Sequence, residues 1–478
     1  MLGFQRVKTM MQDKTVPLCL VAIFFISLSG SFLNAEVYAR IAPYFGIGRE
    51  ISTFFSAALF LVVAFAAVKK PSIFDVRQIS IVVVTLLIAS IFLLTLALEM
   101  ESAPFVMLGL FCRAIGQVWA ITVFSVALTT IASTRIVLLT VGLGTMLAGF
   151  FWQLVPAGLP LIISCAAVML CAIVPIVLMW RLSIPQFTPI QQSATASGLG
   201  VSQFSGFGKL KNLFFCMMLF SIASGYALTF NEESNAPITT VIESVVLALI
   251  VLFVLLSKGE SEAVGKEDQL FSFAALLIVA GFLIAPFSFG LDTSITNGLL
   301  RAGRDCFSLL IWLVLASIGH RNIFMLLPIL GSVRFMSGIG TDIGAIAGRT
   351  TNSLITEAPL AAEALTAAFV FAFIAFLWLG FRDFSFARVI NGVKAITAPE
   401  IKQIGDHIEA RCREIGMREG LTEREIDILG LLAKGRDGKF IAEEYVLSYN
   451  TVKTHIKHIY QKLGVHSRQE LIDLVGAV

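Results

Sequence analysis

Basic residues gather in one short stretch near the end of this chain. Between Tyr445 and Gln469 the sequence holds four lysines or arginines, three histidines and no acidic residue. Ammonium and guanidinium groups attract phosphate, and they also donate hydrogen bonds to guanine edges in the major groove of DNA. The stretch therefore favours contact with a nucleic acid, and the ordinary alternative is a basic helix face that is merely solvated. The four cations are Lys453, Lys457, Lys462 and Arg468.

The spacing of apolar residues predicts the helix that positions these cations. Four apolar side chains step by four, three and four positions, so they share one helix face. They are Val452, Ile456, Ile459 and Leu463. Ser448 stands before the first turn, where a hydroxyl caps backbone N–H groups. The opposite face would present Asn450, Lys453, Thr454, Lys457, His458 and Gln461.

Three further helices are predicted around this one by their own start signals. Thr422 and Glu425 have the spacing of a capping box, in which each side chain bonds the backbone N–H of the other residue. Ser467 and Glu470 repeat that spacing before the final helix. Between the two boxes, "DGKFIAEEY" predicts a short helix, and 446–447 a tight turn. A short helix, a turn and a helix with one apolar and one basic side is the arrangement of helix-turn-helix readers.

Residues 421–472 resemble the LuxR-type helix-turn-helix domain almost position for position. Tyr445 takes the place of the usual leucine, and "RDGK" fills the usual polar stretch before the second helix. Neither departure bears on DNA binding. The matching positions are Thr422, Arg424, Glu425, Gly435, Ile441, Ala442, Ser448, Thr451, Val452, Lys453, His455, Lys462, Leu463 and Arg468.

The resemblance implies sequence-specific binding to double-stranded DNA as a homodimer, with the third helix in the major groove and the fourth at the dimer contact. By position, Lys453, Thr454 and Lys457 would face bases. Ser448, Thr451 and His455 would lie near phosphate or support the scaffold. The whole set of candidate DNA-binding residues is Ser448, Asn450, Thr451, Lys453, Thr454, His455, Lys457, His458, Lys462 and Arg468.

A further helix is expected before this domain, over 399–416. Apolar residues there step by three or four positions, Pro399 suits a first turn and Gly416 suits a C-cap. Such an amphipathic helix carries a conformational signal, self-associates or simply packs on its neighbours. The stepping residues are Ile401, Ile404, Ile408, Cys412 and Ile415.

Most of the chain has a different character. Of its 478 residues, 57% are hydrophobic and 14% are charged, against about 25% charged in ordinary soluble domains. A bilayer crossing needs roughly 20 apolar residues. Basic residues precede the first such run, but it is too long for a signal peptide and is interpreted as retained. Twelve runs qualify: 16–37, 51–68, 79–98, 104–126, 136–154, 159–180, 210–230, 238–256, 270–289, 296–319, 322–347 and 359–381.

Lysine and arginine bias orients these spans. With the N-terminus inside, the inner loops hold sixteen Lys or Arg and the outer loops three, namely Arg40, Arg49 and Arg349. Both termini are then cytoplasmic, and the protein is placed in a bacterial inner membrane. The longest inner loop, 181–209, divides the spans into six plus six, an architecture that resembles the major facilitator superfamily. A shared Arg-Ala, at Arg113 and Arg301, marks the fourth span of each half.

Ionisable residues inside spans are costly and indicate function or structural pairing. Arg301 and Asp305 stand four residues apart, so they are expected to pair on one helix face. Span 11 holds Pro328, several glycines and Arg334, which predicts a broken helix lining a site. One interpretation is a central cavity that binds a small molecule, for example an anion; the other is that these groups neutralise one another as structural pairs. The candidate cavity residues are Arg113, Glu243, Arg301, Asp305 and Arg334.

The expected fold is all-α, with twelve transmembrane helices and a small four-helix C-terminal domain. The expected divisions are 1–15, 16–381, a linker over 382–420 and a DNA-binding domain over 421–478. No catalytic constellation, metal-ligand spacing or cofactor motif is present, and the seven cysteines are expected to be buried apolar residues. The favoured function is a transcription regulator whose membrane domain senses a small molecule. The alternatives are a transporter that carries a regulatory domain, and a membrane anchor without a ligand.

Overall fold

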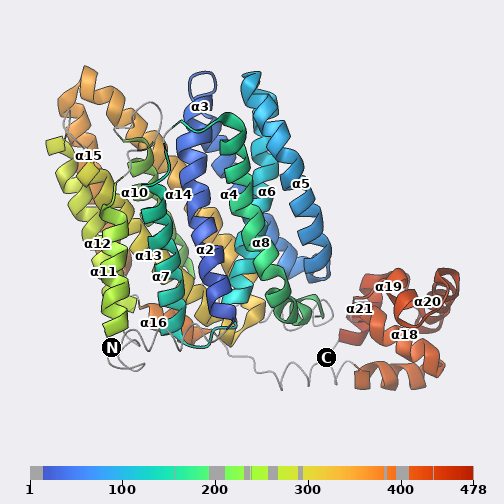
Figure 1. Cartoon of the computed structure of the whole chain (residues 1–478). Coiled ribbons are helices and arrows are strands. Elements are labelled where there is room, and N and C mark those ends of the chain that lie inside the picture. The colour runs from blue at the N-terminus through green and yellow to red at the C-terminus, as the bar shows by residue number, and fades with distance from the viewer. Residues whose placement is uncertain are drawn as a thin grey trace.

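The computed structural model of the chain (Figure 1) describes residues 14–156, 158–192, 210–230, 237, 240–256, 267–288, 294–381, 385–393, 409–433 and 435–476. Every regular element within these ranges is a helix, which confirms the all-α prediction. The buried apolar side chains form two separate cores, one between Val16 and Val393 and one between Cys412 and Val475.

Eleven helical segments of the described chain are long and apolar enough to cross a bilayer. The remaining predicted span, 238–256, corresponds to α11 (Ile242–Leu256), whose 15 residues are fewer than the roughly 20 of a straight crossing. The first segment joins α2 (Thr15–Phe32), a π-helical turn η1 (Leu33–Tyr38) and α3 (Ala39–Ile41). The others are α4 (Gly48–Lys69), α5 (Val76–Glu99), α6 (Ala103–Leu128), α7 (Thr134–Trp152), α8 (Leu161–Gln192), α10 (Lys211–Thr229), α12 (Glu267–Ile284), α13 (Ser294–Arg321), α14 (Ile323–Glu357) and α15 (Pro359–Phe381).

The two halves of the membrane part repeat one packing pattern. The first helix of each half packs on the fifth, as α2 on α7 and α10 on α14. The third packs on the fourth, as α5 on α6 and α12 on α13, and also on the sixth, as α5 on α8 and α12 on α15. The halves meet where α4 packs on α14 and α7 packs on α11. These contacts support the six-plus-six arrangement predicted from the sequence.

The prediction of a broken helix in span 11 is wrong. Helix α14 runs through Pro328 and its glycines for 35 residues without interruption. The glycines serve close packing instead: a Cβ on Gly344 would lie 1.9 Å from the carbonyl oxygen of Ile222 on α10. A Cβ on Gly331 would lie 2.4 Å from the carbonyl oxygen of Phe60 on α4. Small residues of this kind allow helix backbones to approach closely in membranes.

The sixth span also extends further than predicted. Helix α8 continues to Gln192, so the predicted loop over 181–209 begins as helix, and its remainder from 193 lies outside the described residues. Apolar contacts explain the extension: Phe187 is 1% exposed, and its ring centroid lies 5.9 Å from that of Trp119 and 6.0 Å from that of Phe74. The helix therefore keeps a buried face beyond the predicted end of the span.

A short helix, α16 (Phe386–Gly392), follows the last span and is fastened to the second half. The carboxylate of Asp268, in the first turn of α12, accepts the backbone N–H of Phe386 at 3.1 Å. Arg321, the last residue of α13, donates to the side-chain oxygen of Asn391 at 2.8 Å. The fully buried Phe386 ring lies 5.4 Å from Phe271 of α12. The chain that leaves the membrane part is thus tied to the ends of α12 and α13.

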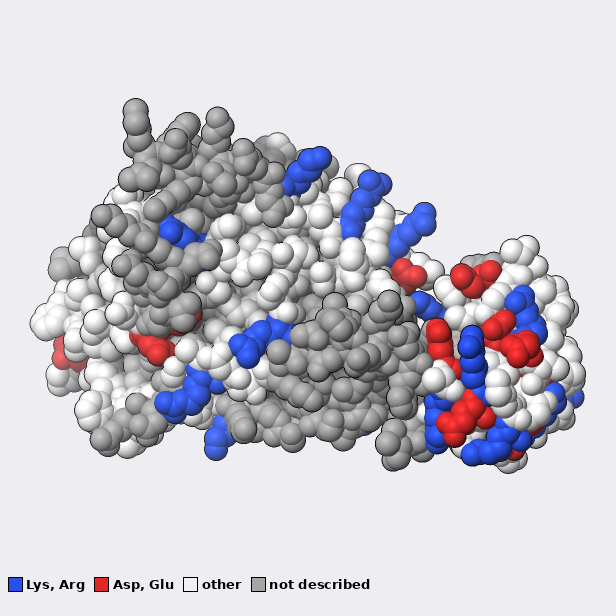
Figure 2. All heavy atoms as spheres, turned by 90° about the horizontal axis from the view of Figure 1, so that it is seen from below, with Lys and Arg blue, Asp and Glu red and all other residues white. Residues whose placement is uncertain are grey.

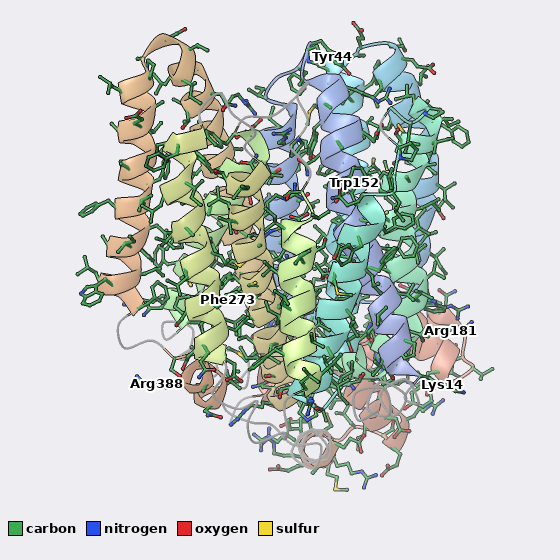
Figure 3. The ribbon with its side chains drawn as sticks, turned by 60° about the vertical axis from the view of Figure 1, so that its left-hand side comes forward. Lys14, Tyr44, Trp152, Arg181, Phe273 and Arg388 are labelled. Carbon is green, nitrogen blue, oxygen red and sulfur yellow. The ribbon has the colours of Figure 1, made fainter. Side chains whose placement is uncertain are left out.

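Several basic residues lie at one end of the helix bundle (Figure 2, Figure 3). Lys14, Arg181 and Arg388 lie at one end and Tyr44 at the other (Figure 3). Seen from the first end, Lys and Arg side chains lie at several places around the membrane part (Figure 2).

The C-terminal part contains a helix over 409–418, α18 (Glu423–Ala433), α19 (Gly438–Glu444), α20 (Tyr449–Leu463) and α21 (Arg468–Gly476). Of the helix predicted over 399–416, residues before 409 lie outside the described chain. The helix does not end at Gly416 as predicted but continues to residue 418. A Cβ at Gly416 would lie 2.4 Å from the Ile426 side chain, so glycine at this position allows close contact with α18. The left-handed residue after the helix is Gly420, with φ 68°. Cys412 and Ile415 are buried, as their spacing predicted.

Candidate functional site

Helix α20 presents the predicted polar and basic face. Its first turn is fixed by Ser448, whose hydroxyl accepts the Thr451 backbone N–H at 3.1 Å, and its end by Gly464 with φ 64°. Val452 and Ile459 are fully buried, which orients the helix on the domain core. The side chains exposed on the other side are those of Asn450, Lys453, Thr454, Lys457 and His458.

The turn before α20 sets the angle between α19 and α20. Leu447 donates its backbone N–H to the carbonyl oxygen of Ala442 at 2.9 Å. Val446 has φ 54°, a left-handed conformation that is strained for a β-branched residue, and its side chain is 91% exposed. Both α18 and α19 pack on α20. The three helices therefore form a helix-turn-helix unit with the basic face outward.

Lys462 is partly exposed, but its ammonium group is bonded to other parts of the domain. Its ammonium group lies 2.7 Å from Glu425 Oε2 and donates to the Gly420 carbonyl oxygen at 3.0 Å. The same carboxylate accepts the backbone N–H and hydroxyl of Thr422 at 2.8 and 3.1 Å, which confirms the predicted capping box. Burial opposes the ionisation of Glu425, but the bonds from Lys462 and Thr422 prevail and lower its pKa to about 2. Two elements far apart in sequence, α18 and α20, are joined by this pair.

Three of the other candidate residues form hydrogen bonds within the domain, namely Ser448, Thr451 and Arg468. Arg468 donates to the carbonyl oxygen of Gly435, which ties the start of α21 to the loop after α18. The hydroxyls of Ser448 and Thr451 lie 2.8 Å apart within the cap of α20. His455 is half-buried.

In the membrane part, Arg301 and Asp305, whose spacing allows a pair, each form an ion pair with another residue. Arg301 instead forms a forked pair with Glu243 on α11, at 2.7 Å from Nε to Oε2 and 3.0 Å from Nη2 to Oε1. Asp305 pairs with Arg304 at 2.8 Å. The helical spacing permits the predicted pair, but the neighbouring helix offers both oxygens of a carboxylate, which fit the planar guanidinium better. These groups neutralise one another as structural pairs.

Arg113 and Arg334 have different surroundings. Arg113 is 6% exposed, and its Nη2 donates to the Ser29 hydroxyl of α2 at 3.4 Å. The guanidinium of Arg334 lies over the Trp312 ring, 4.6 Å from its centroid, where the face of the aromatic ring attracts a cation. None of the five predicted cavity residues lines either of two cavities of the described chain, one between α7, α11, α12 and α13 and one beside Arg49 and Arg349.

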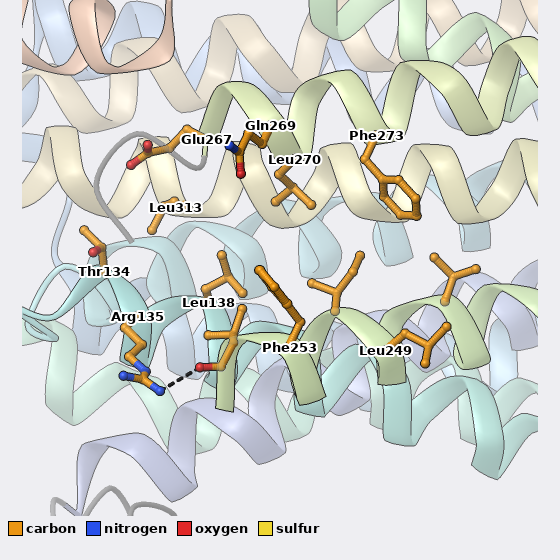
Figure 4. A pocket seen from close by; sticks show the side chains of 13 residues that line it. Thr134, Arg135, Leu138, Leu249, Phe253, Glu267, Gln269, Leu270, Phe273 and Leu313 are labelled. Carbon is orange, nitrogen blue, oxygen red and sulfur yellow. Dashed lines mark hydrogen bonds between the residues drawn. The ribbon is translucent and has the colours of Figure 1, made fainter. Parts of the chain in front are cut away.

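The larger of these cavities measures about 320 Å³ and lies between α7, α11, α12 and α13 (Figure 4). Its lining is mostly apolar, and Leu249 and Phe253 are 61% and 58% exposed, so it faces the outside of the bundle. At one end Arg135 donates to the carbonyl oxygen of Val254 at 2.6 Å. This cavity is an apolar side pocket with one cation at its margin.

The smaller cavity measures about 190 Å³ and combines apolar residues with two arginines. Sequence reasoning missed it, since its arginines, Arg49 and Arg349, were counted only as outer-loop charges. Their rarity on that side of the membrane was the signal that could have found them. The lining residues are Tyr38, Ile41, Ala42, Phe45, Gly46, Arg49 and Arg349.

Comparison with known proteins gives different results for the two parts. Residues 419–475 match the family model described as bacterial regulatory proteins, luxR family. The transcriptional regulatory protein LiaR of Bacillus subtilis (strain 168) is 35% identical over 91 residues, which are 18% of this chain and 43% of that protein. The HTH-type transcriptional regulator MalT of Serratia proteamaculans (strain 568) is 48% identical over 52 residues, 11% of this chain and 6% of that protein. The chain thus spans less than half the length of these relatives.

Among solved structures, the human organic anion transporter MFSD10 covers 77% of this chain and 99% of its own, with 14% identity and a TM-score of 0.49. The E. coli fucose:proton symporter FucP covers 76% and 98%, with 13% identity and a TM-score of 0.47. At this sequence identity and TM-score, the structural similarity assigns no activity to the chain. Residues 419–475 are a luxR-family helix-turn-helix domain, joined in one polypeptide to a multi-pass helical membrane domain.

Proposed function

We propose that this protein is a membrane-embedded transcription regulator, in which the membrane domain senses a small molecule and controls DNA binding by the C-terminal domain. The observation that carries the proposal is the exposed basic face of α20 in a luxR-family domain that continues a multi-pass membrane chain. A single span would suffice to anchor such a domain. Two packed halves of six helices instead supply the two-state element that a sensor requires.

DNA recognition falls to the outer face of α20. Lys453, Thr454 and Lys457 are exposed there at helical spacing, where side chains can reach base edges in the major groove. Asn450 and His458 flank them on the same face. Lys462 and Arg468 act through the fold, because both are bonded to other parts of the domain. The active form is a homodimer on DNA, as the resemblance to LuxR-type domains implies.

The basic end of the membrane part is the cytoplasmic end. Of the lysines and arginines near the ends of described spans, Lys14, Arg181 and Arg388 lie at the end opposite Tyr44 (Figure 3). Loops rich in Lys and Arg remain on the cytoplasmic side of a bacterial membrane. We therefore expect α16 and the C-terminal domain in the cytoplasm, where DNA is accessible.

Helix α16 transmits the state of the membrane domain. It is bonded to Asp268 of α12 and Arg321 of α13, so a shift of the second half moves the start of the linker. A ligand changes DNA binding only if it has different affinities for the two states of the bundle.

The test uses DNA sequences selected from a random pool by the soluble fragment 395–478. Replacing Lys453 and Lys457 together by alanine should abolish the preference for selected over scrambled DNA in a fluorescence anisotropy titration. The matched control is the double variant Arg413→Ala/Arg418→Ala, which removes the same charge from exposed positions of the helix before α18. Sequence preference that survives in the first variant, or disappears equally in the control, would overturn the assignment of α20 as the reading helix.

A transporter that carries a regulatory domain is the second candidate, favoured by the repeated packing of the two halves. Measuring the uptake of a ligand into proteoliposomes distinguishes a transporter from a sensor. Accumulation against a gradient would establish transport, whereas binding without uptake supports a sensor.

A further inference from the structure

The smaller cavity lies where the two halves of the membrane domain meet at the end marked by Tyr44 (Figure 3). Tyr38, Ile41 and Ala42 come from the end of the first span, and Phe45 and Gly46 from the turn that follows. Arg49 and Arg349 complete the lining. Arg49 lies in the first turn of α4 in the first half, whereas Arg349 belongs to α14 of the second half. A ligand in this cavity therefore contacts both halves.

The first-half wall of the cavity is rigid. The π-helical turn η1 ends at Tyr38, which is 4% exposed, and such turns recur at functional sites. The turn between the spans is closed by a bond from the Phe45 backbone N–H to the Ile41 carbonyl oxygen at 2.7 Å. Gly48 allows this tight packing, since a Cβ there would lie 2.6 Å from the Ile41 side chain. The wall is preorganised for binding.

The charges around the cavity favour an anion. The guanidinium of Arg49, 7% exposed, lies over the Tyr38 ring at 5.7 Å from its centroid. Arg349 forms an ion pair with Glu50 and bonds to the Gly46 carbonyl oxygen at 3.4 Å. Among the described residues, two guanidiniums line the cavity and no carboxylate does. Ile41 and Phe45 add apolar surface beside the guanidiniums.

We infer that this cavity binds a small organic carboxylate, held by Arg49 of one half and Arg349 of the other. A volume of about 190 Å³ lies below the roughly 300–1,000 Å³ of cavities for drug-sized ligands, so the ligand has few heavy atoms. Forked guanidinium donors match the two oxygens of a carboxylate, and the phenylalanine wall accommodates its apolar body. The inference rests on the proposed function, because it names the sensing site of the regulator.

The position of the site explains how binding changes the protein. The carboxylate is held from both sides only while the outer ends of the two halves are together. Binding therefore stabilises that state over one in which the halves separate at this end.

The experiment measures thermal unfolding of the purified full-length protein in detergent with acetate, benzoate, succinate and citrate, and with neutral benzamide. Benzoate or acetate should raise the Tm, and benzamide should not. Arg49→Gln and Arg349→Gln should each weaken binding by roughly tenfold or more, since each removes a charge-assisted hydrogen bond. The matched control, Arg77→Gln, removes an exposed arginine from α5 and should bind as the wild type does. Failure of every carboxylate to raise the Tm, or unchanged binding in both cavity variants, would overturn the proposal.

If those substitutions unfold the protein, a cysteine variant tests the proposal instead. Ala42→Cys adds one thiol to the lining, while the seven native cysteines are buried. A membrane-impermeant maleimide should label this thiol from outside intact cells, and benzoate should slow the labelling. Labelling at the same rate with benzoate present would contradict the proposal. DNA binding by fragment 395–478 is measured without the membrane domain, so failure of the cavity and failure of the proposed function are told apart.

Discussion

Replacing Lys462 by methionine removes one ammonium group and keeps most of the aliphatic stem. In the native domain this group lies 2.7 Å from Glu425 and 3.0 Å from the Gly420 carbonyl oxygen. Glu425 is only 3% exposed, so water cannot fully replace the lost partner. The carboxylate keeps its two bonds from Thr422.

The expected loss of stability is about 2 kcal/mol. A hydrogen bond to a charged group contributes about 1.5–3 kcal/mol, and breaking a buried ion pair costs about 3–5 kcal/mol. The range for a hydrogen bond to a charged group applies, because the Lys462 side chain is 37% exposed and solvent screens part of the ion pair. For a domain of this size, such a loss lowers the Tm by about 10 °C.

The pH dependence gives a second signature. Burial raises the pKa of Glu425, but Lys462 and Thr422 lower it from 4.5 to about 2 in the folded domain. Because the folded pKa is below the unfolded one, the ionised carboxylate adds stability above about pH 4.5. That stability is lost as the pH falls from 4.5 towards 2. The Lys462→Met variant should lose less stability across this window than the wild type.

Urea and thermal unfolding of fragment 395–478, followed by circular dichroism at pH 7 and pH 3, measures both effects. The fragment contains the whole separate core between Cys412 and Val475. Lys457→Met is the matched control, since it removes the same charge from an exposed position on α20 and should change stability by less than about 0.5 kcal/mol. If Lys462→Met is as stable as this control and instead loses DNA affinity, Lys462 is a phosphate contact and the structural role is refuted.

Three further predictions concern strain, charge and packing. Val446→Gly should stabilise the C-terminal domain by about 0.5–1 kcal/mol in urea unfolding, because it relieves a left-handed φ of 54° at an exposed residue. Glu243→Gln should lower the Tm of the full-length protein, because it leaves the Arg301 charge beside a neutral group. The double variant Glu243→Leu/Arg301→Met should recover most of that loss. A double variant with the same Tm as the single one would show that the two residues are not coupled. Gly344→Ala should abolish the monodisperse peak in size-exclusion chromatography, since its Cβ meets backbone at 1.9 Å, whereas Gly30→Ala, with nothing within 4 Å, should not.

Sequence patterns predicted the features that depend on nearby residues. The capping box of Thr422 and Glu425 and the buried stripe of α20 involve positions three or four apart, and both occur as expected. Apolar runs located the spans for the same reason. The end of the sixth span was misplaced, because Phe187 is buried by Trp119, far away in the sequence.

Partners of charged residues could not be predicted in the same way. Arg301 has Asp305 within one helical turn, yet it pairs with Glu243, which only the packing of α11 on α13 brings near. Arg49 and Arg349 are 300 residues apart and meet because the two halves are packed together. Long-range packing, rather than local spacing, decides which buried charges meet.

The membrane domain is proposed to govern DNA binding. The most direct test is the DNA affinity of the full-length protein in nanodiscs, compared between the wild type and Asp268→Ala, which removes the two hydrogen bonds between Asp268 of α12 and the start of α16. The DNA is the sequence selected by fragment 395–478, and the affinity of that fragment is the reference. We predict that the loss of these bonds changes the Kd of the full-length protein by at least about fivefold, the lower end of usual allosteric coupling. Equal Kd values for the wild type, the variant and the fragment would show that the membrane domain is only an anchor.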